Sequence, residues 1–212
     1  MNCSVSPLFP TPLIQVEVEK DTSELLENDE FTISQQSRRK SQDAGSQLYS
    51  NQRILEKYPK TKGILLDIFT CVAEEVIGYK KRNYAITTSW ITLTNKGDGS
   101  QLHNHKNSFW SCVYYYQEEY SEGTGEILFE NPNQFLFDFC FGDCDIEQFN
   151  YLNGTTCKIT PKPNLLLIFP SYLSHQILKH NNDTSRSSLA FNIVPLGSWG
   201  EDDNRYDQAW IT

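Results

Sequence analysis

The chain has 212 residues, of which 38% are hydrophobic and 21% are charged. This length and composition predict a single domain, residues 1–212, with enough apolar material for a sizeable core. The formal net charge of −9 repels a phosphate backbone and therefore disfavours nucleic acid as a partner. No stretch approaches the ~20 apolar residues that span a bilayer, and residues 1–10 lack the pattern of a signal peptide. We expect a soluble, intracellular (cytoplasmic) protein.

The first 52 residues predict little regular structure. Ile14, Val16 and Val18 alternate with Leu13, Gln15 and Glu17, so residues 7–18 are expected to hold an opening strand. Residues 19–52 are polar and have few apolar anchors. This composition favours a surface segment with one short helix.

An amphipathic helix is predicted between Thr61 and Tyr79. Apolar residues recur there every three or four positions, at Leu65, Ile68, Phe69, Val72 and Val76. Thr61 is the expected N-cap, and Gly78 marks the expected end of the helix. We expect this helix to support the core rather than to carry a site.

The remainder of the chain is typical of a β protein. Runs rich in Thr, Ile and aromatic residues predict strands at 84–94, 109–117, 125–130, 155–160, 165–169 and 185–194. Residues 131–150 interrupt this series. Their alternating phenylalanines fit an extra strand and a lid over a site equally well. The sequence as a whole predicts a mainly β fold with helical additions.

All four histidines lie in this strand-rich half. His103 and His105 would point to the same side of a strand, and His175 could be brought to them by a distant strand. Two near ligands and one remote ligand are the spacing of a metal site. For an isolated His-x-His string, ordinary core or surface histidines are the more common explanation. His180, in a polar loop, is expected to be solvated.

A second polar group opens the last predicted strand. Arg186 and Ser188 share one face of that strand, and a guanidinium fork with a nearby hydroxyl suits a dicarboxylate. Counting in twos places Asn192 on the same face, where it could touch a cofactor or a residue beside it. Taken alone, this string could equally be an exposed arginine followed by two serines.

The order of these groups resembles that of the Fe(II)- and 2-oxoglutarate-dependent oxygenases, which carry His-x-Asp/Glu, a remote His and then Arg-x-Ser. The chain is most similar to a branch found in bacteria and their phages that is related to prolyl 4-hydroxylases. The strings that carry this likeness are LFPTP at 8–12, HNHKNS at 103–108, SCVYYY at 111–116 and FPSYLSH at 169–175. They span nearly the whole chain in the correct order.

The resemblance implies a double-stranded β-helix (jelly-roll, cupin-like) core with an N-terminal helical support. It implies an enzyme that uses Fe(II), 2-oxoglutarate and O₂ to hydroxylate an unactivated C–H bond of a peptide or a small molecule, with release of succinate and CO₂. The implied metal ligands are His103 and His175. The implied cosubstrate residues are Arg186, Ser188 and Tyr115.

Position 105 departs from the family pattern, which usually has a carboxylate there. A neutral imidazole leaves the site one negative charge poorer and should weaken Fe(II) binding. His105 could ligate in a three-histidine site, which is the assignment we adopt. It could instead stand beside a water or an anion, or the true pair could be His105 and Asn107. The same departure favours the alternative function, a cupin-like barrel that binds a metal or ligand without oxygenase turnover.

Overall fold

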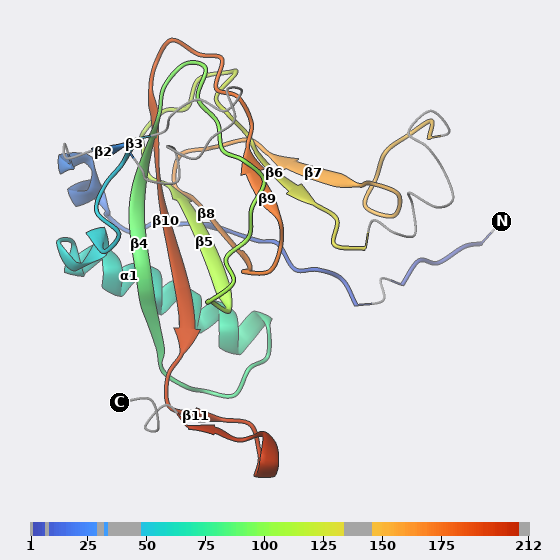
Figure 1. The fold of residues 1–212 in the computed structure, drawn as a ribbon. Coiled ribbons are helices and arrows are strands. Elements are labelled where there is room, and N and C mark those ends of the chain that lie inside the picture. The colour runs from blue at the N-terminus through green and yellow to red at the C-terminus, as the bar shows by residue number, and fades with distance from the viewer. Residues whose placement is uncertain (1, 7–8, 29–31, 34–47, 134–145, 208–212) are drawn as a thin grey trace.

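The core of the protein is a pair of antiparallel sheets that pack face to face, with a helix on the outer side of the larger sheet (Figure 1). The structure, a computed structural model, describes residues 2–6, 9–28, 32–33, 48–133 and 146–207. None of the helices in these ranges is long and apolar enough to cross a membrane. The arrangement confirms the mainly β fold expected from the sequence.

Seven strands of the described chain form the larger sheet. They are β1 (Ile14–Glu17), β2 (Thr32–Ile33), β3 (Leu48–Tyr49), β4 (Tyr84–Thr94), β5 (Trp110–Tyr115), β8 (Leu165–Pro170) and β10 (Arg186–Pro195). Their order in the sheet is β1-β8-β5-β10-β4-β3-β2, and each neighbouring pair is antiparallel. Strands β5 and β10, which carry the predicted cosubstrate residues, therefore lie in the middle of the sheet.

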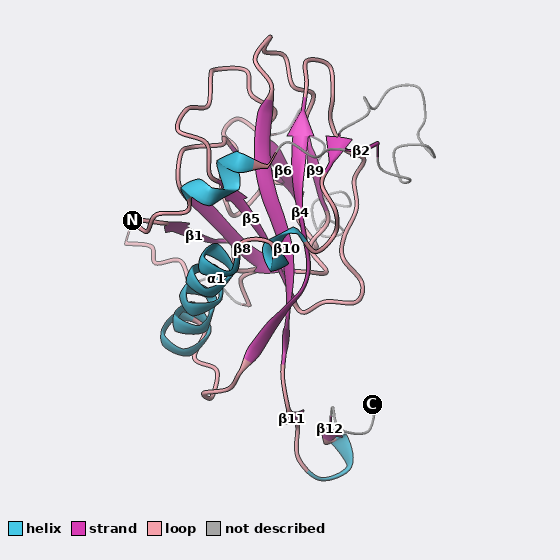
Figure 2. Ribbon diagram, turned by 90° about the vertical axis from the view of Figure 1, so that its left-hand side faces the viewer, coloured by secondary structure: helices cyan, strands magenta, loops and turns pink. Residues whose placement is uncertain are grey.

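The smaller sheet has β6 (Ile127–Glu130) between β7 (Thr156–Ile159) and β9 (His175–Ile177). A hairpin of β11 (Ser198–Trp199) and β12 (Tyr206–Asp207), joined through the 3-10 helix η6 (Asp202–Asn204), extends away from both sheets (Figure 2). All six predicted strands of the second half are present, with ends shifted by at most two residues. The sequence predicted neither β9 nor the hairpin, because such short strands have too few positions to show an alternation.

Helix α1 (Pro59–Cys71) covers the outer face of the larger sheet (Figure 2). Its Leu65 and Phe69 are fully buried in a cluster with side chains of β4 and β10. The predicted N-cap, Thr61, is wrong: the helix begins at Pro59, because the fixed φ of proline suits the first helical position and its missing N–H costs nothing there. Thr61 is buried within the first turn.

The end of the helix also differs in part from the prediction. After α1 the chain continues as a π-helical segment, η4 (Val72–Val76), and Gly78 ends it with a φ of +82°. A π turn holds more residues than an α turn, so the apolar face rotates away from the sheet. Val76 is consequently 66% exposed, whereas the helical pattern predicted it to be buried.

The N-terminal segment is joined to the first turn of this helix by hydrogen bonds from Lys60 and Thr61 to Asp21 and Glu24. The opening strand is present as β1, and residues 19–52 contain the 3-10 helix η1 (Ser23–Glu27) as well as β2 and β3; residues 29–31 and 34–47 lie outside the described residues. A second 3-10 helix, η3 (Ile54–Glu56), leads into α1. Leu25 of η1 is fully buried in the core, so part of the predicted surface segment is structural.

Alternation along the central strands creates two different faces. On β10, Leu189, Phe191 and Ile193 belong to the cluster under α1. Arg186, Ser188 and Asn192 stand at the alternate positions of the same strand and therefore face the space between the two sheets. The apolar part of that space is filled by a second cluster of Val113, Tyr115, Ile127, Phe129, Leu167, Phe169 and Leu173.

We predict that Glu24→Ala lowers the free energy of unfolding by about 1 kcal/mol, because it removes an acceptor from the start of α1. The carboxylate of Glu24 accepts a hydrogen bond from the Thr61 N–H at 2.7 Å, so it caps the helix from a distant segment. Glu24→Gln keeps an acceptor oxygen and should therefore lower the free energy of unfolding by a smaller amount. Urea denaturation followed by circular dichroism measures the change, with exposed Glu75→Ala as the control. Equal stability of Glu24→Ala and Glu75→Ala would contradict the capping role.

Candidate active site

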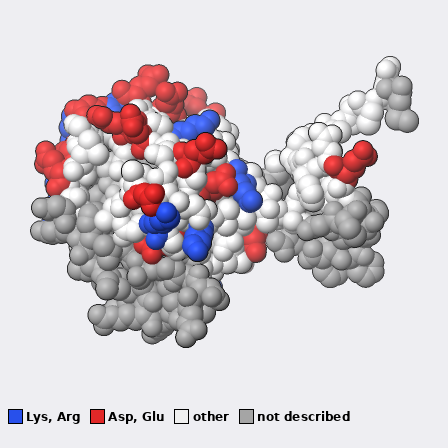
Figure 3. All heavy atoms as spheres, turned by 90° about the horizontal axis from the view of Figure 1, so that it is seen from above, with Lys and Arg blue, Asp and Glu red and all other residues white. Residues whose placement is uncertain are grey.

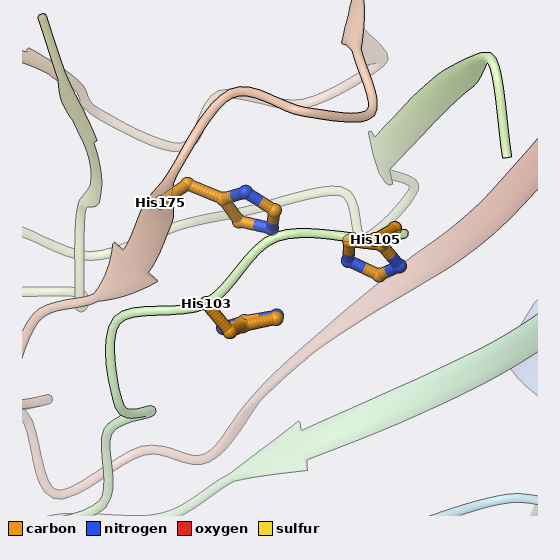
Figure 4. Close-up of side chains that lie close together, drawn as sticks. All are labelled: His103, His105 and His175. Atoms are coloured by element: carbon orange, nitrogen blue, oxygen red, sulfur yellow. The ribbon is translucent and has the colours of Figure 1, made fainter. Parts of the chain in front are cut away.

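Three histidines meet at the edge of the space between the sheets. His175 is the first residue of β9, and His103 and His105 lie in the loop between β4 and β5 rather than in the regular strand that the sequence predicted. One nitrogen of each ring lies within 4.8 Å of those of the other two (Figure 4). Within the described part of the chain, this is the one group of three or more His, Cys, Asp or Glu side chains with such spacing.

Backbone hydrogen bonds hold this loop against β9. The N–H of His103 donates to the carbonyl of His175, and the N–H of His175 donates back to the carbonyl of His103, both at 2.9 Å. The N–H of His105 donates to the carbonyl of Ser171, also at 2.9 Å. Two residues that are remote in sequence are thus fixed side by side by a single antiparallel bridge.

The hydrogen bonds of two rings leave their Nε2 atoms free for a metal. Nδ1 of His103 lies 2.8 Å from the carbonyl of Gln101, and Nδ1 of His175 lies 2.9 Å from that of Leu173. A carbonyl only accepts, so Nδ1 carries the proton in both rings and Nε2 keeps its lone pair. Such contacts are typical of metal-binding histidines, because they fix the ring and its tautomer.

His105 is held differently. Its ring is nearly parallel to those of Trp90 and His175, with centroids 5.7 and 5.3 Å away. Its Nδ1 lies 3.2 Å from the side-chain nitrogen of Asn192. Asn192, predicted to touch a cofactor or a residue beside it, thus contacts His105.

Burial keeps two of the imidazoles neutral. Burial, together with the smaller electrostatic effect of His103, lowers the pKa of His175 to about 3 and that of His105 to about 4. Both rings are therefore uncharged at neutral pH. A metal ion binds a neutral imidazole through the nitrogen that carries no proton, so binding at these two rings releases no net proton.

A buried cation occupies the other end of the same space. Arg186 is 2% exposed, and its Nη1 donates to Ser188 Oγ at 3.0 Å. Among the described residues, its Nε and Nη2 have no hydrogen-bond partner, and neither does the buried hydroxyl of Tyr115. The ring centroid of Tyr115 lies 5.7 Å from the guanidinium carbon. Burial lowers the pKa of Arg186 and raises that of Tyr115 to about 12.

These donors fit one end of a dicarboxylate. A guanidinium taken out of water without an anion is destabilising, and a carboxylate can accept from Nε and Nη2 at once. The Tyr115 hydroxyl supplies a further unused donor close by. The residues present therefore suit both a metal ion at the histidines and a carboxylate at Arg186.

His180 is buried, not solvated as the sequence predicted. It is 0% exposed, its Nδ1 accepts from the N–H of Gly125 at 3.1 Å, and its Nε2 donates to the carbonyl of Thr184 at 2.7 Å. Its backbone also pairs with Gly97 and Asp98. His180 therefore ties together three loops at the Arg186 end of β10. Sequence could not reveal this, because the partners are backbone groups.

The surface at that end is not basic. Figure 3 looks onto the molecule from above, and acidic side chains predominate among the charged groups on the described part of the visible face. Three exposed residues of the loop after β5 are Glu118, Glu119 and Glu122. An anionic ligand would therefore meet a mainly acidic surface, rather than a basic patch, on the described part of this face.

An open groove runs from His105 along the surface. Its volume is about 640 Å³, and aromatic side chains and prolines supply much of its wall, including Tyr79, Phe109, Tyr172 and Pro170. Phe109 and Tyr172 are 51% and 60% exposed. Neither was predicted as a site residue. The usable signal was their position, because Phe109 follows the His-x-His string closely and Tyr172 lies three residues before His175.

The segment predicted as a lid or an extra strand, residues 131–150, is described only at its two ends. Residues 134–145 lie outside the described residues. The choice between lid and strand therefore stays a prediction.

The fold is that of the double-stranded β-helix oxygenases. A prolyl 4-hydroxylase from Pseudomonas putida matches with a TM-score of 0.54 and 13% identity, over 86% of this chain and 92% of its own. HygX from Streptomyces hygroscopicus, solved with nickel, 2-oxoglutarate and hygromycin B, matches with a TM-score of 0.58 and 12% identity, over 91% and 87%. A Trichoplax adhaerens prolyl hydroxylase, in complex with a peptide fragment of hypoxia inducible factor, matches with a TM-score of 0.56 and 15% identity, over 85% and 82%.

The sequence itself matches one family model, described as "Putative 2OG-Fe(II) oxygenase", over residues 88–192. This range contains the three histidines, Arg186 and Asn192. No curated protein has a matching sequence. The chain belongs to the 2OG-Fe(II) oxygenase family, whose members use Fe(II) and 2-oxoglutarate.

We predict that Arg186→Met does not destabilise the ligand-free protein and raises its free energy of unfolding by about 1 kcal/mol or more, because a buried unpaired charge is replaced by an apolar chain of similar length. Denaturant unfolding without ligand measures this, and Leu189→Ala, fully buried on the same strand, is the matched core truncation. If Arg186→Met lowered the free energy of unfolding as much as Leu189→Ala does, Arg186 would be a structural residue instead.

Proposed function

We propose that His103, His105 and His175 hold Fe(II) and that Arg186, Ser188 and Tyr115 hold the far carboxylate of 2-oxoglutarate. The observation that carries this proposal is that three converging imidazoles and a buried guanidinium face the same space between the sheets. Two donors of that guanidinium have no partner among the described residues. The reaction is the hydroxylation of an unactivated C–H bond of a peptide or small-molecule substrate, with release of succinate and CO₂.

The protein's own residues bind and orient. The hydrogen bonds from Nδ1 of His103 and His175 to the carbonyls of Gln101 and Leu173 keep the proton on Nδ1. Nε2 of each ring therefore has a lone pair for the metal. Arg186 fixes the cosubstrate from the other end through a bidentate pair, which sets its direction as well as its affinity. When bound, Fe(II) and 2-oxoglutarate supply the activation of O₂ for oxidation of a C–H bond.

Apolar packing restricts water on one side of the histidines. The rings of Phe129 and Phe169 lie 6.0 and 4.9 Å from that of His175, and both side chains are buried. The groove beside His105 is open and largely apolar on the other side. We infer that substrate reaches the metal along this groove and presents an apolar part to Phe109 and Tyr172. The HygX and prolyl hydroxylase complexes contain a small molecule and a peptide respectively, and an open groove admits either class.

The alternative, a metal-binding barrel without turnover, leaves Arg186 unexplained. Such a barrel needs the histidines but gains nothing from burying a guanidinium that has unused donors. The absence of a carboxylate at position 105 is the observation in its favour. The unused donors of Arg186 and Tyr115 therefore favour the oxygenase over this alternative.

We predict that His103→Ala and His175→Ala abolish binding of Fe(II), since each leaves at most two ligands. His105→Asp should bind as well as the natural protein or better, because it restores a negative charge to the site. Anaerobic Fe(II) titration measures the stoichiometry. His180→Gln is the control, since His180 lies among backbone groups away from the other three, and it should still bind one ion. Loss of all metal in His105→Asp would count against the three-histidine assignment.

We predict that Arg186→Ala weakens 2-oxoglutarate binding by roughly 30-fold or more, the cost of losing a bidentate partner in a desolvated site. Tyr115→Phe and Ser188→Ala each change one hydrogen bond and should weaken binding by about tenfold. The measurement is the weak visible charge-transfer band of the anaerobic Fe(II)–2-oxoglutarate chelate. Fe(II) binding alone should survive in all three variants. Unchanged 2-oxoglutarate affinity in Arg186→Ala would remove the cosubstrate assignment and revive the alternative.

A further inference from the structure

Asn192 forms the link between His105 and a set of buried hydroxyls. The residue is 8% exposed and lies where the pairing of β10 with β4 shifts register. Its Nδ2 donates to Thr88 Oγ1 at 2.9 Å and lies 3.2 Å from Nδ1 of His105. Its Oδ1 accepts from Ser111 Oγ at 2.9 Å, and Ser111 Oγ is 2.8 Å from Ser171 Oγ.

This contact sets the tautomer of His105. An amide NH₂ group only donates, so Nδ1 of His105 must accept from it, and the single proton of the neutral ring is then on Nε2. A protonated Nε2 has no lone pair for a metal. His103 and His175 differ, because their Nδ1 atoms face carbonyls that require a proton there. Two of the three histidines are preset as ligands, and the third is not.

The surroundings of Asn192 let its amide turn without losing a hydrogen bond. Both side-chain partners other than His105 are hydroxyls, which can donate as well as accept. With the amide reversed, Oδ1 would accept from Nδ1–H of His105 and from the Thr88 hydroxyl. Nδ2 would donate to Ser111 Oγ, and the Ser111 hydroxyl would then donate a hydrogen bond to Ser171 Oγ. The two orientations therefore satisfy the same set of groups.

We infer that Asn192 is a positioning residue whose amide orientation decides whether His105 can bind a metal. The carbonyl turns toward His105 when the ion binds, and His105 then carries its proton on Nδ1 and offers Nε2. The ring loses a proton from Nε2 and gains one on Nδ1, so there is no net proton release. The inference rests on the proposed metal site, and it assigns to Asn192 the function that the Gln101 and Leu173 carbonyls have for the other two rings.

The direct test is the tautomer of His105, read from long-range ¹H–¹⁵N correlations of ¹⁵N-labelled protein, with His105→Gln used to assign the signals. Diamagnetic Zn(II) serves as the metal probe. Without metal we expect the Nε2–H form in the natural protein, and with Zn(II) the Nδ1–H form. In Asn192→Asp the carboxylate only accepts, so the Nδ1–H form is expected before any metal is added.

Zn(II) affinity, measured by chelator competition, gives a second readout. Asn192→Leu should weaken binding by about 10- to 100-fold, and Asn192→Asp should bind at least as tightly as the natural protein. Thr92→Val, buried on neighbouring β4 but outside this hydrogen-bonded set, is the control and should not change the affinity. The contrast between Asp and Leu at position 192 separates positioning from a general packing defect.

The outcomes distinguish this inference from the function on which it rests. Failure of the natural protein to bind Zn(II) would overturn the proposed metal site and this inference together. Normal Zn(II) binding with equal affinity in Asn192→Leu and Asn192→Asp, or an Nδ1–H form of His105 already present without metal, would overturn this inference alone.

Discussion

The buried guanidinium of Arg186 is the feature that constrains the whole site most strongly. A guanidinium that is 2% exposed and has two donors without partners in the described part of the chain is costly to a folded protein, and alternation along β10 places it deep between the sheets. The ligand-free fold is stable only because the packing of the surrounding core offsets the free-energy cost of burying this charge. An anion that enters the space would relieve this cost, and part of its affinity would then come from these donors of the protein.

The two ends of the site are built by different elements, and antiparallel pairing keeps them in register. Arg186 and Tyr115 belong to adjacent strands of the larger sheet, whereas His175 begins a strand of the smaller one. The His103–His175 bridge then fixes the loop after β4 to that smaller sheet. The separation between the three histidines and Arg186 is therefore set by the packing of one sheet on the other, and Phe129 and Phe169 belong to the apolar cluster between the two sheets.

The long strands and the helix were predicted because their period-two and helical patterns are local signals in the sequence. The grouping of the three histidines was predicted from their order and spacing along the chain. It missed features that depend on backbone partners or on register. His180 was expected in solvent but pairs with backbone groups of other loops. Asn192 was placed correctly on the inner face of β10, yet its contact with His105 depends on how a distant loop packs. Val76 was misplaced because the turn there is π rather than α.

The most direct test of the proposed site is a crystal structure of the protein with Fe(II) and 2-oxoglutarate, prepared without oxygen. We predict one ion on the ring nitrogens of His103, His105 and His175. We also predict one carboxylate of 2-oxoglutarate on Nε and Nη2 of Arg186, within reach of the Tyr115 hydroxyl. A 2-oxoglutarate molecule bound outside the space between the sheets, or a metal-bound complex in which the Arg186 donors stay unpaired, would contradict it.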